Sequence, residues 1–540
     1  MTDMLRDPVS DDCPGAREIG FSCPDSYNAA SILFDNLDRG NAARIAIRGP
    51  WGQMTYAQLC ARAAQAGQGL LSLGLARGDR VLLLLDDGPD YPVFLYGALR
   101  AGLVPVMLNT LTPADLLAYY ASDSSARAIV LDGGLVDRVT AEVIAGGGLA
   151  TAIVAGDGVV AGLDSHRAAD WLDRFPAMLD AADTGRDDMA FWMYSSGSTG
   201  RPKGIVHLHH DMAYTAASFG DRVLRLTPDD VCFSVPKIFF AYGLGNSLTF
   251  PFSVGASSVL MPGRPEPEAV FATIAAHRPT VFYGLPTLYT ALVQSPAAAG
   301  VDFSSLRLCL SAAEVLSAEV AGAWSRLSGL PIVEGLGSTE VLHIYLSNDQ
   351  AEQRHGSAGR RVPGYEVELR DPDGRLVGDE EEGILWVRGQ SNAPFYWNRP
   401  DKTAETMRGD WIWTGDRFTR DADGFHYFRG RADDLIKVSG QWVHPLEVEL
   451  CLAEHPALRE VAVLGVELAD RRMALRAYVV PRESGADPDA LTTTLRDHVK
   501  RTLIPYKAPR LFTVLDELPK TGTGKIDRQG LRKIEDGGTT

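Results

Sequence analysis

Paired cysteines, long apolar runs and excess positive charge are all missing from this chain of 540 residues. Its six cysteines are scattered and form no C-x-x-C pair, so we predict neither a disulfide framework nor a zinc site. No apolar run approaches the roughly 18 residues that a membrane-spanning helix needs. The first 24 residues are polar and acidic, unlike a signal peptide. We therefore expect a soluble, cytoplasmic protein.

The charge balance excludes further classes. A formal net charge of −17 argues against a general binder of nucleic acid or of anionic membranes. An anionic substrate would therefore have to meet a local cluster of cations. With 45% hydrophobic residues the composition is globular, and the length predicts two or more domains because one core rarely grows so large.

The most informative stretch is residues 194–204, Tyr-Ser-Ser-Gly-Ser-Thr-Gly-Arg-Pro-Lys-Gly, which follows an apolar run of strand length at 189–194. Glycines let backbone N–H groups turn toward one point, and hydroxyls and cations add donors for phosphate oxygens. The spacing does not fit a Walker A loop. A flexible surface turn would need neither the strand nor the final Arg-Pro-Lys. We predict a clamp for nucleotide phosphates at Ser195, Ser196, Gly197, Ser198, Thr199, Gly200 and Lys203.

This string resembles the phosphate-binding signature of the adenylate-forming enzymes, which include acyl-CoA synthetases, carrier-protein adenylation domains and firefly-type luciferases. The resemblance runs from about residue 25 to about residue 530. It implies an α/β fold with a large N-terminal domain of several subdomains and mostly parallel sheets, followed by a small mobile α+β domain. The alternation of short apolar strands with helices, such as 81–85 followed by 90–102, agrees with a parallel sheet covered on both faces.

We expect four parts in the chain: a loosely ordered leader at 1–25, an N-terminal adenylation domain with the ATP and aryl acid sites at 26–430, a hinge at 431–434, and a mobile C-terminal domain with the catalytic lysine at 435–540. The boundary is marked by the charged, glycine-bearing residues 429–440. A hinge needs only a few residues that can absorb a backbone change. The resemblance puts the hinge at Asp433, brings Arg431 to the nucleotide, and places Lys437 and Gly440 in the segment that serves the thioester step.

Residues 335–348 (GLGSTEVLHIYLSN) hold the second motif, in which a hydroxyl, Thr339, stands beside a carboxylate, Glu340. A carboxylate that faces a triphosphate needs a cation between them, and Mg²⁺ is the usual ion. Alone, Gly-Ser-Thr-Glu is equally a helix cap. The resemblance implies that Thr339 contacts the α-phosphate and that Glu340 holds the metal.

The resemblance adds further nucleotide contacts. Ala313 and Glu314 follow a predicted strand and would lie against the adenine, although many relatives have glycine where this chain has Ala313. Asp416 would accept the ribose hydroxyls, as acidic residues do in other nucleotide sites. Gly335 completes the predicted nucleotide set.

Residues 237–246 (KIFFAYGLGN) combine aromatic and small residues, as the walls of a pocket for a flat ring do, but a buried core segment has the same composition. This string and residues 342–348 resemble the acid-binding segments of benzoate-type CoA ligases. A lone histidine there is otherwise a satisfied core residue. The resemblance implies an aryl-acid pocket formed by Ala241, Tyr242, Tyr283, Gly284, Gly337, His343 and Ile344.

Two basic motifs remain. Three histidines lie within residues 207–210, and we favour a helix start beside the nucleotide site over a metal site. Residues 519–528 (PKTGTGKIDR) alone would be an exposed basic loop. They match the catalytic-lysine loop of the family, which makes Lys525 the residue that stabilises charge forming on oxygen.

Together the motifs predict an aryl acid–CoA ligase. An aryl carboxylate attacks the α-phosphate of Mg·ATP to give an aroyl-AMP and pyrophosphate, and the thiol of coenzyme A then displaces AMP. The predicted catalytic residues are Lys525, Thr339 and Glu340. The alternatives are a stand-alone adenylating enzyme that loads an acyl carrier protein, a luciferase-like oxygenase and a silent nucleotide-binding protein. The sequence leaves open a homodimer and the choice among benzoate, 2-aminobenzoate and the hydroxybenzoates.

Overall fold

The computed structural model describes residues 13–195, 201–314, 316–432, 436–438, 441–468, 472–483, 485, 487–520 and 526–535. The chain forms two compact units. Unit 1 comprises Met1–Val367 and Trp386–Trp413, and unit 2 comprises Glu368–Leu385 and Thr414–Thr540. The predicted domain limits stay a prediction. Several predicted site residues lie outside the described residues, namely Ser196, Gly197, Ser198, Thr199, Gly200, Asp433, Gly440 and Lys525.

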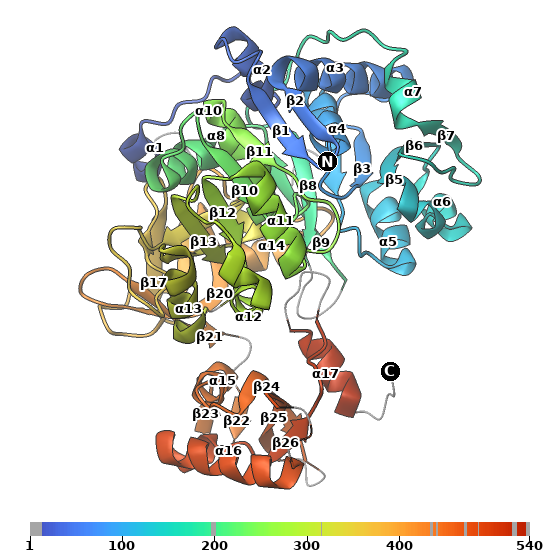
Figure 1. The fold of residues 1–540 in the computed structure, drawn as a ribbon. Helices are drawn as coiled ribbons and strands as arrows, with labels where there is room; N and C mark the ends of the chain where they lie inside the picture. The colour runs from blue at the N-terminus through green and yellow to red at the C-terminus, as the bar shows by residue number, and fades with distance from the viewer. Residues whose placement is uncertain are drawn as a thin grey trace. The chain divides into compact units, whose positions relative to one another are not determined.

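The first sheet of unit 1 has seven strands in the order β7-β6-β5-β3-β4-β8-β9 (Figure 1). Neighbouring strands within this sheet are parallel, except β8 and β9, which form an antiparallel hairpin. The strands are β3 (Arg80–Leu84), β4 (Val104–Met107), β5 (Ala128–Asp132), β6 (Thr151–Ala155), β7 (Asp164–Arg167), β8 (Met189–Ser195) and β9 (Lys203–Leu208).

Helices cover both faces of this sheet, which explains why its central strands are mostly apolar. Along β3, Leu83 faces the core formed with α3 (Tyr56–Ser72) and α4 (Asp90–Arg100). Its neighbour Leu82 faces the opposite core, formed with α5 (Ala114–Ser124) and α6 (Ala141–Gly147). Successive side chains of a strand point to opposite faces, so the four buried positions of β3, residues 81–84, are all apolar.

The second sheet of unit 1 has nine strands in the order β16-β15-β14-β13-β12-β10-β11-β1-β2. Its middle strands, from β1 through β11, β10, β12 and β13 to β14, are parallel, and its edges are antiparallel. The strands are β1 (Ile45–Gly49), β2 (Gly52–Thr55), β10 (Val231–Ser234), β11 (Ser257–Val259), β12 (Val281–Gly284), β13 (Leu308–Ala312), β14 (Ile332–Gly337), β15 (Ile344–Ser347) and β16 (Arg360–Arg361).

One face of this second sheet is covered by α11 (Pro267–His277), α12 (Pro286–Gln294) and α13 (Ala318–Ser328), seen in front of it in Figure 1. Its other face shares a core with α9 (Ala241–Leu244), the π-helix η4 (Gly245–Thr249) and α10 (Phe250–Val254). The remaining elements of unit 1 are α1 (Pro14–Ile19), α2 (Ser31–Asp38), η2 (Gly133–Arg138), α7 (Ala168–Leu172), α8 (Asp211–Thr215), η3 (Ala216–Leu224), η5 (Pro296–Gly300), η6 (Thr339–Val341), α14 (Pro400–Thr406) and β19 (Met407–Arg408).

Unit 2 ends in a small α+β lobe. Its three-stranded sheet has the order β24-β25-β26, with an antiparallel and then a parallel pairing. Helices and strands both occur in this lobe, as the predicted α+β class requires. The elements are β22 (Ile436–Val438), β23 (Gln441–Val443), α15 (Pro445–Ala453), β24 (Leu458–Glu467), β25 (Met473–Pro481), α16 (Pro488–Thr502), η7 (Pro505–Lys507), β26 (Leu511–Val514) and α17 (Arg528–Glu535).

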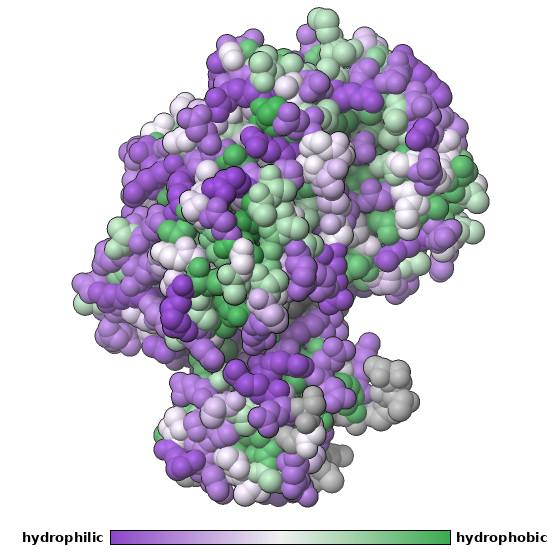
Figure 2. Space-filling view, viewed as in Figure 1, coloured by the Kyte–Doolittle hydropathy of each residue, from purple (hydrophilic) through white to green (hydrophobic). Residues whose placement is uncertain are grey.

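Other strands are β17 (Glu366–Arg370), β18 (Gly383–Arg388), β20 (Trp411–Arg420) and β21 (His426–Arg431). In the face shown in Figure 2, hydrophilic residues dominate and hydrophobic residues form small separate groups among them. None of the helices in the described part of the chain is both long and apolar enough to cross a membrane.

Candidate functional site

The ends of the predicted phosphate loop lie opposite one another. In the β8–β9 hairpin Ser195 pairs with Lys203, and Tyr194 pairs with Gly204. The two described ends of the predicted phosphate loop are therefore adjacent. The ammonium of Lys203 lies 4.2 Å from the ring centroid of Tyr396.

Helix α5 anchors this hairpin. The hydroxyl of Tyr194 donates to Asp123 Oδ2 at 2.8 Å, and its ring stacks on Tyr120 at 4.1 Å. Burial, and then the Asp123 charge, raise the pKa of Tyr194, so its hydroxyl keeps the proton that it donates. The hydroxyl of Tyr119 donates to the carbonyl of Pro202 at 3.1 Å. Both stems of the loop are thus fixed by one helix, which the sequence did not indicate.

The Thr339–Glu340 motif lies on η6, directly after β14. Glu340 Oε1 accepts a hydrogen bond of 2.8 Å from the hydroxyl of Tyr396. The ring of Tyr396 is the one over which the Lys203 ammonium lies. The structure thereby brings the predicted Lys203 and Glu340 together through a residue that the sequence analysis missed. Tyr396 is nearly 60 residues beyond the motif in the chain and has no motif of its own.

Hydrogen bonds from other segments fix the backbone of the same turn. The residue after η6, the buried Leu342, is in the left-handed region with φ +69°. Such a conformation persists in a non-glycine residue only where its surroundings fix it. The three carbonyls of the turn accept hydrogen bonds from other segments: Thr339 from His207 Nε2 at 2.8 Å, Glu340 from Ala393 N at 2.7 Å and Val341 from Ser391 Oγ at 2.8 Å.

The predicted adenine segment follows β13. Ala313 has φ +77°, the left-handed region that favours glycine, which gives a physical reason for the glycine that many relatives carry there. Glu314 Oε2 accepts from the hydroxyl of Thr287 at 2.8 Å. Gly335 lies on the neighbouring strand, opposite Ala312.

Two predicted nucleotide residues belong to unit 2 and contact one another. Asp416 and Arg431 are paired across β20 and β21, and Arg431 Nη1 donates to Asp416 Oδ1 at 3.1 Å. Lys437 lies on β22. Lys520 and Ile526 pair on either side of the predicted lysine loop, and Lys520 forms an ion pair with Glu460.

The predicted aryl pocket gathers around His343. The ring of His343 lies 5.5 Å from Tyr242, and Tyr242 lies 6.4 Å from Tyr283. Phe219 and Phe250, which the sequence analysis missed, lie 5.0 and 4.5 Å from His343. Both belong to or adjoin π-helices, η3 and η4, which often mark functional sites.

Glycines let these parts approach closely. A Cβ on Gly245 would lie 2.4 Å from His343 Cδ2, and one on Gly337 would lie 2.5 Å from the His343 carbonyl oxygen. A Cβ on Gly284 would meet the Tyr289 ring at 2.7 Å. Ile344 packs against Gly335, 3.0 Å from where its Cβ would be. The predicted small residues are therefore required by packing.

The pocket is uncharged. Burial lowers the pKa of His343 to about 3, only weakly opposed by the Tyr242 backbone, so its imidazole is neutral. Neither ring nitrogen of His343, nor the hydroxyl of Tyr242, makes a hydrogen bond of normal geometry to a described residue. Burial raises the pKa of Tyr242. The role of His343 in binding the aryl acid stays a prediction.

The segment that carries Ala241 and Tyr242 is tied to the end of β3. The Asp87 carboxylate accepts from the Ile238 amide at 3.0 Å, and Lys237 Nζ lies 2.7 Å from Asp86 Oδ1. Burial raises the pKa of Asp87 to about 7. These contacts connect the pocket wall to the seven-stranded sheet.

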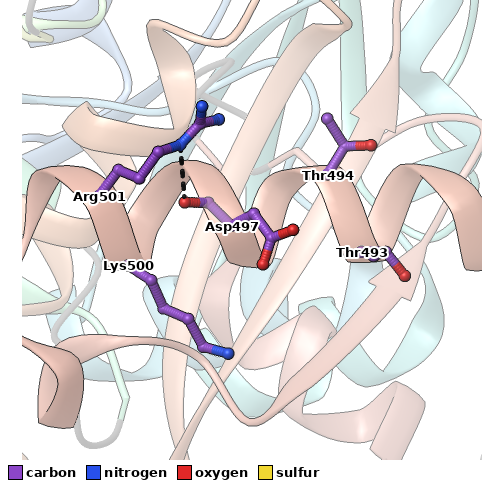
Figure 3. Close-up of a pocket in the computed structure, with 5 residues that line it drawn as sticks. All are labelled: Thr493, Thr494, Asp497, Lys500 and Arg501. Carbon is purple, nitrogen blue, oxygen red and sulfur yellow. Dashed lines mark hydrogen bonds between the residues drawn. The ribbon is translucent and has the colours of Figure 1, made fainter.

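Two hollows lie away from these residues. One, of about 380 Å³, lies along a single helix, α16, between the solvated side chains drawn in Figure 3. Its dashed contact is the hydrogen bond of 3.2 Å from Arg501 Nε to the Asp497 carbonyl. The other, of about 150 Å³, lies between Arg225, Arg307 and Asp349. Neither includes a predicted site residue.

Known proteins match the chain along nearly all its length. The pattern of the AMP-binding enzymes matches residues 34–397, and that of the AMP-binding enzyme C-terminal domain matches residues 447–525. Benzoate–CoA ligase of Thauera aromatica is 42% identical over 94% of this chain and 96% of its own. The 4-hydroxybenzoate–CoA/benzoate–CoA ligase of Rhodopseudomonas palustris is 40% identical over 95% of each chain. The crystal structure of the anthranilate CoA ligase AuaEII in complex with anthranoyl-AMP has a TM-score of 0.89 at 37% identity, covering 95% of this chain and 98% of that chain.

Proposed function

The chain belongs to the family of AMP-binding enzymes, and from that premise we propose that it is an aryl acid–CoA ligase. It is an AMP-forming acid–thiol ligase of the benzoate–CoA ligase type, with ATP and coenzyme A as substrates. The relatives named as CoA ligases favour coenzyme A over a carrier protein as acceptor. The observation that supports an aryl acid as the substrate is the uncharged cluster of rings around His343.

In the first step an oxygen of the aryl carboxylate attacks the α-phosphorus of ATP, and the bond from that phosphorus to pyrophosphate breaks. Both the nucleophile and the leaving group are anionic, so positioning and charge stabilisation dominate the barrier. Lys203 and Thr339 flank the phosphates, and Lys525 supplies a further cation. Support for this arrangement is the fixed hairpin and the contact of Lys203 with the Tyr396 ring.

A magnesium ion fits the donor set of the turn. Glu340 offers a carboxylate whose orientation is fixed by Tyr396, and Mg²⁺ is commonly held by one or two carboxylates together with substrate phosphates and water. Glu340 would hold the ion, which neutralises phosphate charge when it is bound. Asp416, oriented by Arg431, accepts the ribose hydroxyls.

In the second step the sulfur of coenzyme A attacks the carbonyl carbon of the aroyl-AMP, and the bond to AMP breaks. We assign the change between the two steps to a turn about Asp433 that withdraws Lys525 and presents Lys437 and Gly440. A hinge of a few residues suffices for such a change. Lys525→Ala then stops adenylation but still converts supplied aroyl-AMP to thioester, and equal loss of both steps would contradict the hinge.

We also propose a cytoplasmic location and a homodimer. All six cysteines are buried and free, which suits a reducing compartment. Light scattering of the purified protein gives its molecular mass, and a monomer would refute the dimer.

The function is tested by AMP release that depends on ATP and coenzyme A, measured with benzoate, aminobenzoates, hydroxybenzoates and a medium-chain fatty acid. We expect AMP and aroyl-CoA from at least one small aryl acid. Turnover of the fatty acid alone would overturn the pocket assignment. Pyrophosphate release without a thioester would point to a carrier protein as acceptor.

A further inference from the structure

The three histidines at the end of β9 are all buried, but they have different partners. His209 Nδ1 accepts a hydrogen bond of 3.0 Å from the Ala29 amide, so this nitrogen carries no proton. Burial lowers the pKa of His209 to about 4, and the ring is neutral at physiological pH. His209 therefore accepts a hydrogen bond from a neighbouring segment, whereas His207 donates one to Thr339.

His207 lies between two acceptors. Its Nε2 is 2.8 Å from the carbonyl oxygen of Thr339, which can only accept, so Nε2 carries a proton. Its Nδ1 is 2.7 Å from Asp211 Oδ2, and the same oxygen accepts from the Leu208 amide at 3.0 Å. The imidazole of His207 is thus held between the Thr339 carbonyl and the Asp211 carboxyl group, and both side chains are fully buried.

His210 contacts a segment that in turn contacts the same turn. Its two nitrogens lie 2.9 Å from the carbonyl oxygens of Arg186 and Gln390. Although burial lowers the pKa of His210, the hydrogen bond to Asp187 and the Asp211 charge raise it overall. Gln390 precedes Ser391, whose hydroxyl holds the Val341 carbonyl. His207 thus contacts the first residue of η6 directly, whereas His210 contacts the segment whose Ser391 holds the last residue of η6.

A buried ion pair is weak support for stability, because desolvation opposes the attraction between the charges. A role in geometry is better supported here, since the contact of His207 is with the backbone of Thr339 itself. The turn contains the strained Leu342, so its form depends on such outside contacts. Small displacements of positioning groups can lower a reaction rate by about 100-fold.

We propose that His207 and Asp211 are positioning residues for adenylate formation, which hold the Thr339 carbonyl so that Thr339 and Glu340 face the reacting phosphate. This inference rests on the proposed function. It assigns no contact with substrate to either residue, because both side chains are fully buried behind the turn. Both ring nitrogens of His207 are used in these hydrogen bonds.

The test compares two half-reactions in full-length variants. Adenylation is measured as pyrophosphate release from ATP and aryl acid without coenzyme A, and thioester formation is measured from supplied aroyl-AMP. We expect His207→Leu to lower the adenylation kcat about 100-fold, with the KM for aryl acid changed less than 3-fold and thioester formation retained. His207→Gln, whose amide can still donate to Thr339, should recover at least 10-fold of that loss. His209→Gln is the matched control, and both half-reactions should stay within 3-fold of the wild type.

Equal loss of both half-reactions in folded His207→Leu, or no loss in either, would overturn the proposal. If His207→Leu does not fold, Asp211→Asn decides: the amide that replaces the carboxyl group holds the His207 ring less firmly, and adenylation alone should fall about 10-fold. Unchanged or equally reduced half-reactions in Asp211→Asn would overturn the proposal. Wild-type protein that forms no aroyl-AMP from any aryl acid would instead refute the proposed function.

Discussion

The aryl pocket and the Thr339–Glu340 turn lie in the same unit but are built in opposite ways. The pocket is formed by rings, is uncharged, and has polar atoms on His343 and Tyr242 without normal hydrogen bonds to described residues. In the turn, three successive carbonyls and one oxygen of Glu340 accept from fixed donors. Preorganised charge lowers barriers, whereas unpaired buried polar atoms favour a ligand that satisfies them. The comparison predicts that the turn is preorganised for the chemistry and that the aryl acid completes the ring cluster.

The strongest test of this contrast removes charge from the turn. Glu340→Gln should lower the adenylation kcat by about 100- to 1000-fold, the range seen when one preorganised charge-stabilising group is lost. Aryl acid binding, measured by calorimetry, should be unchanged because the pocket is separate. Glu352→Gln, which alters an exposed carboxylate paired with Arg360, is the control. Equal loss of acid binding in Glu340→Gln would show that the two regions are not separate.

The converse change disturbs the pocket and spares the turn. In Gly245→Ala the new Cβ would meet His343 Cδ2 at 2.4 Å, so the imidazole must move into the space for the ring. Overpacking of this kind costs about 1–3 kcal/mol, so kcat/KM for the aryl acid should fall about 10- to 100-fold, mainly through KM. Gly300→Ala is the control, because nothing lies within 4 Å of its Cβ. A loss confined to kcat would refute the pocket assignment.

A smaller effect is expected where the turn is supported by a single hydroxyl. Tyr396→Phe keeps the ring beside Lys203 but removes the donor to Glu340. We expect about a 10-fold rise in the Mg²⁺ concentration needed for half-maximal adenylation, since outer partners of a metal-binding carboxylate typically tune affinity by 10- to 100-fold. A titration of pyrophosphate release with Mg²⁺ measures it. An unchanged Mg²⁺ requirement would argue against Glu340 as the ligand.

The sequence predicted the strands well because burial on both faces makes them apolar throughout. The expected strands at 81–85 and 189–194 are Arg80–Leu84 and Met189–Ser195 in the structure. The family motifs likewise located Thr339, Glu340 and His343, since each motif is contiguous in the chain. The resemblance and the fold class are both confirmed by the relatives.

What the sequence could not predict depends on distant segments. Tyr396 reaches Glu340, and Phe219 and Phe250 reach His343, from elements whose own composition signals only a core. The His207–Asp211 pair was also missed, because spacing alone does not show that Thr339 lies at the other ring nitrogen. Partners of this kind are set by sheet order, which local patterns do not specify.

The smallest expected effect is the pH dependence of stability that the buried His343 causes. The pKa of His343 is about 3 in the folded protein and about 6.5 when unfolded, so between these values the unfolded state binds more protons. Stability is therefore lost as the pH falls below 6.5, by about 1 kcal/mol at pH 5.5. His343→Gln removes this term, so its urea midpoint should fall less than that of the wild type between pH 7.5 and 5.5. Tyr283→Phe, in the same ring cluster, should keep the wild-type dependence. Identical pH dependence in His343→Gln and the wild type would mean that the pocket is open to solvent and that the contrast with the turn is one of partners alone.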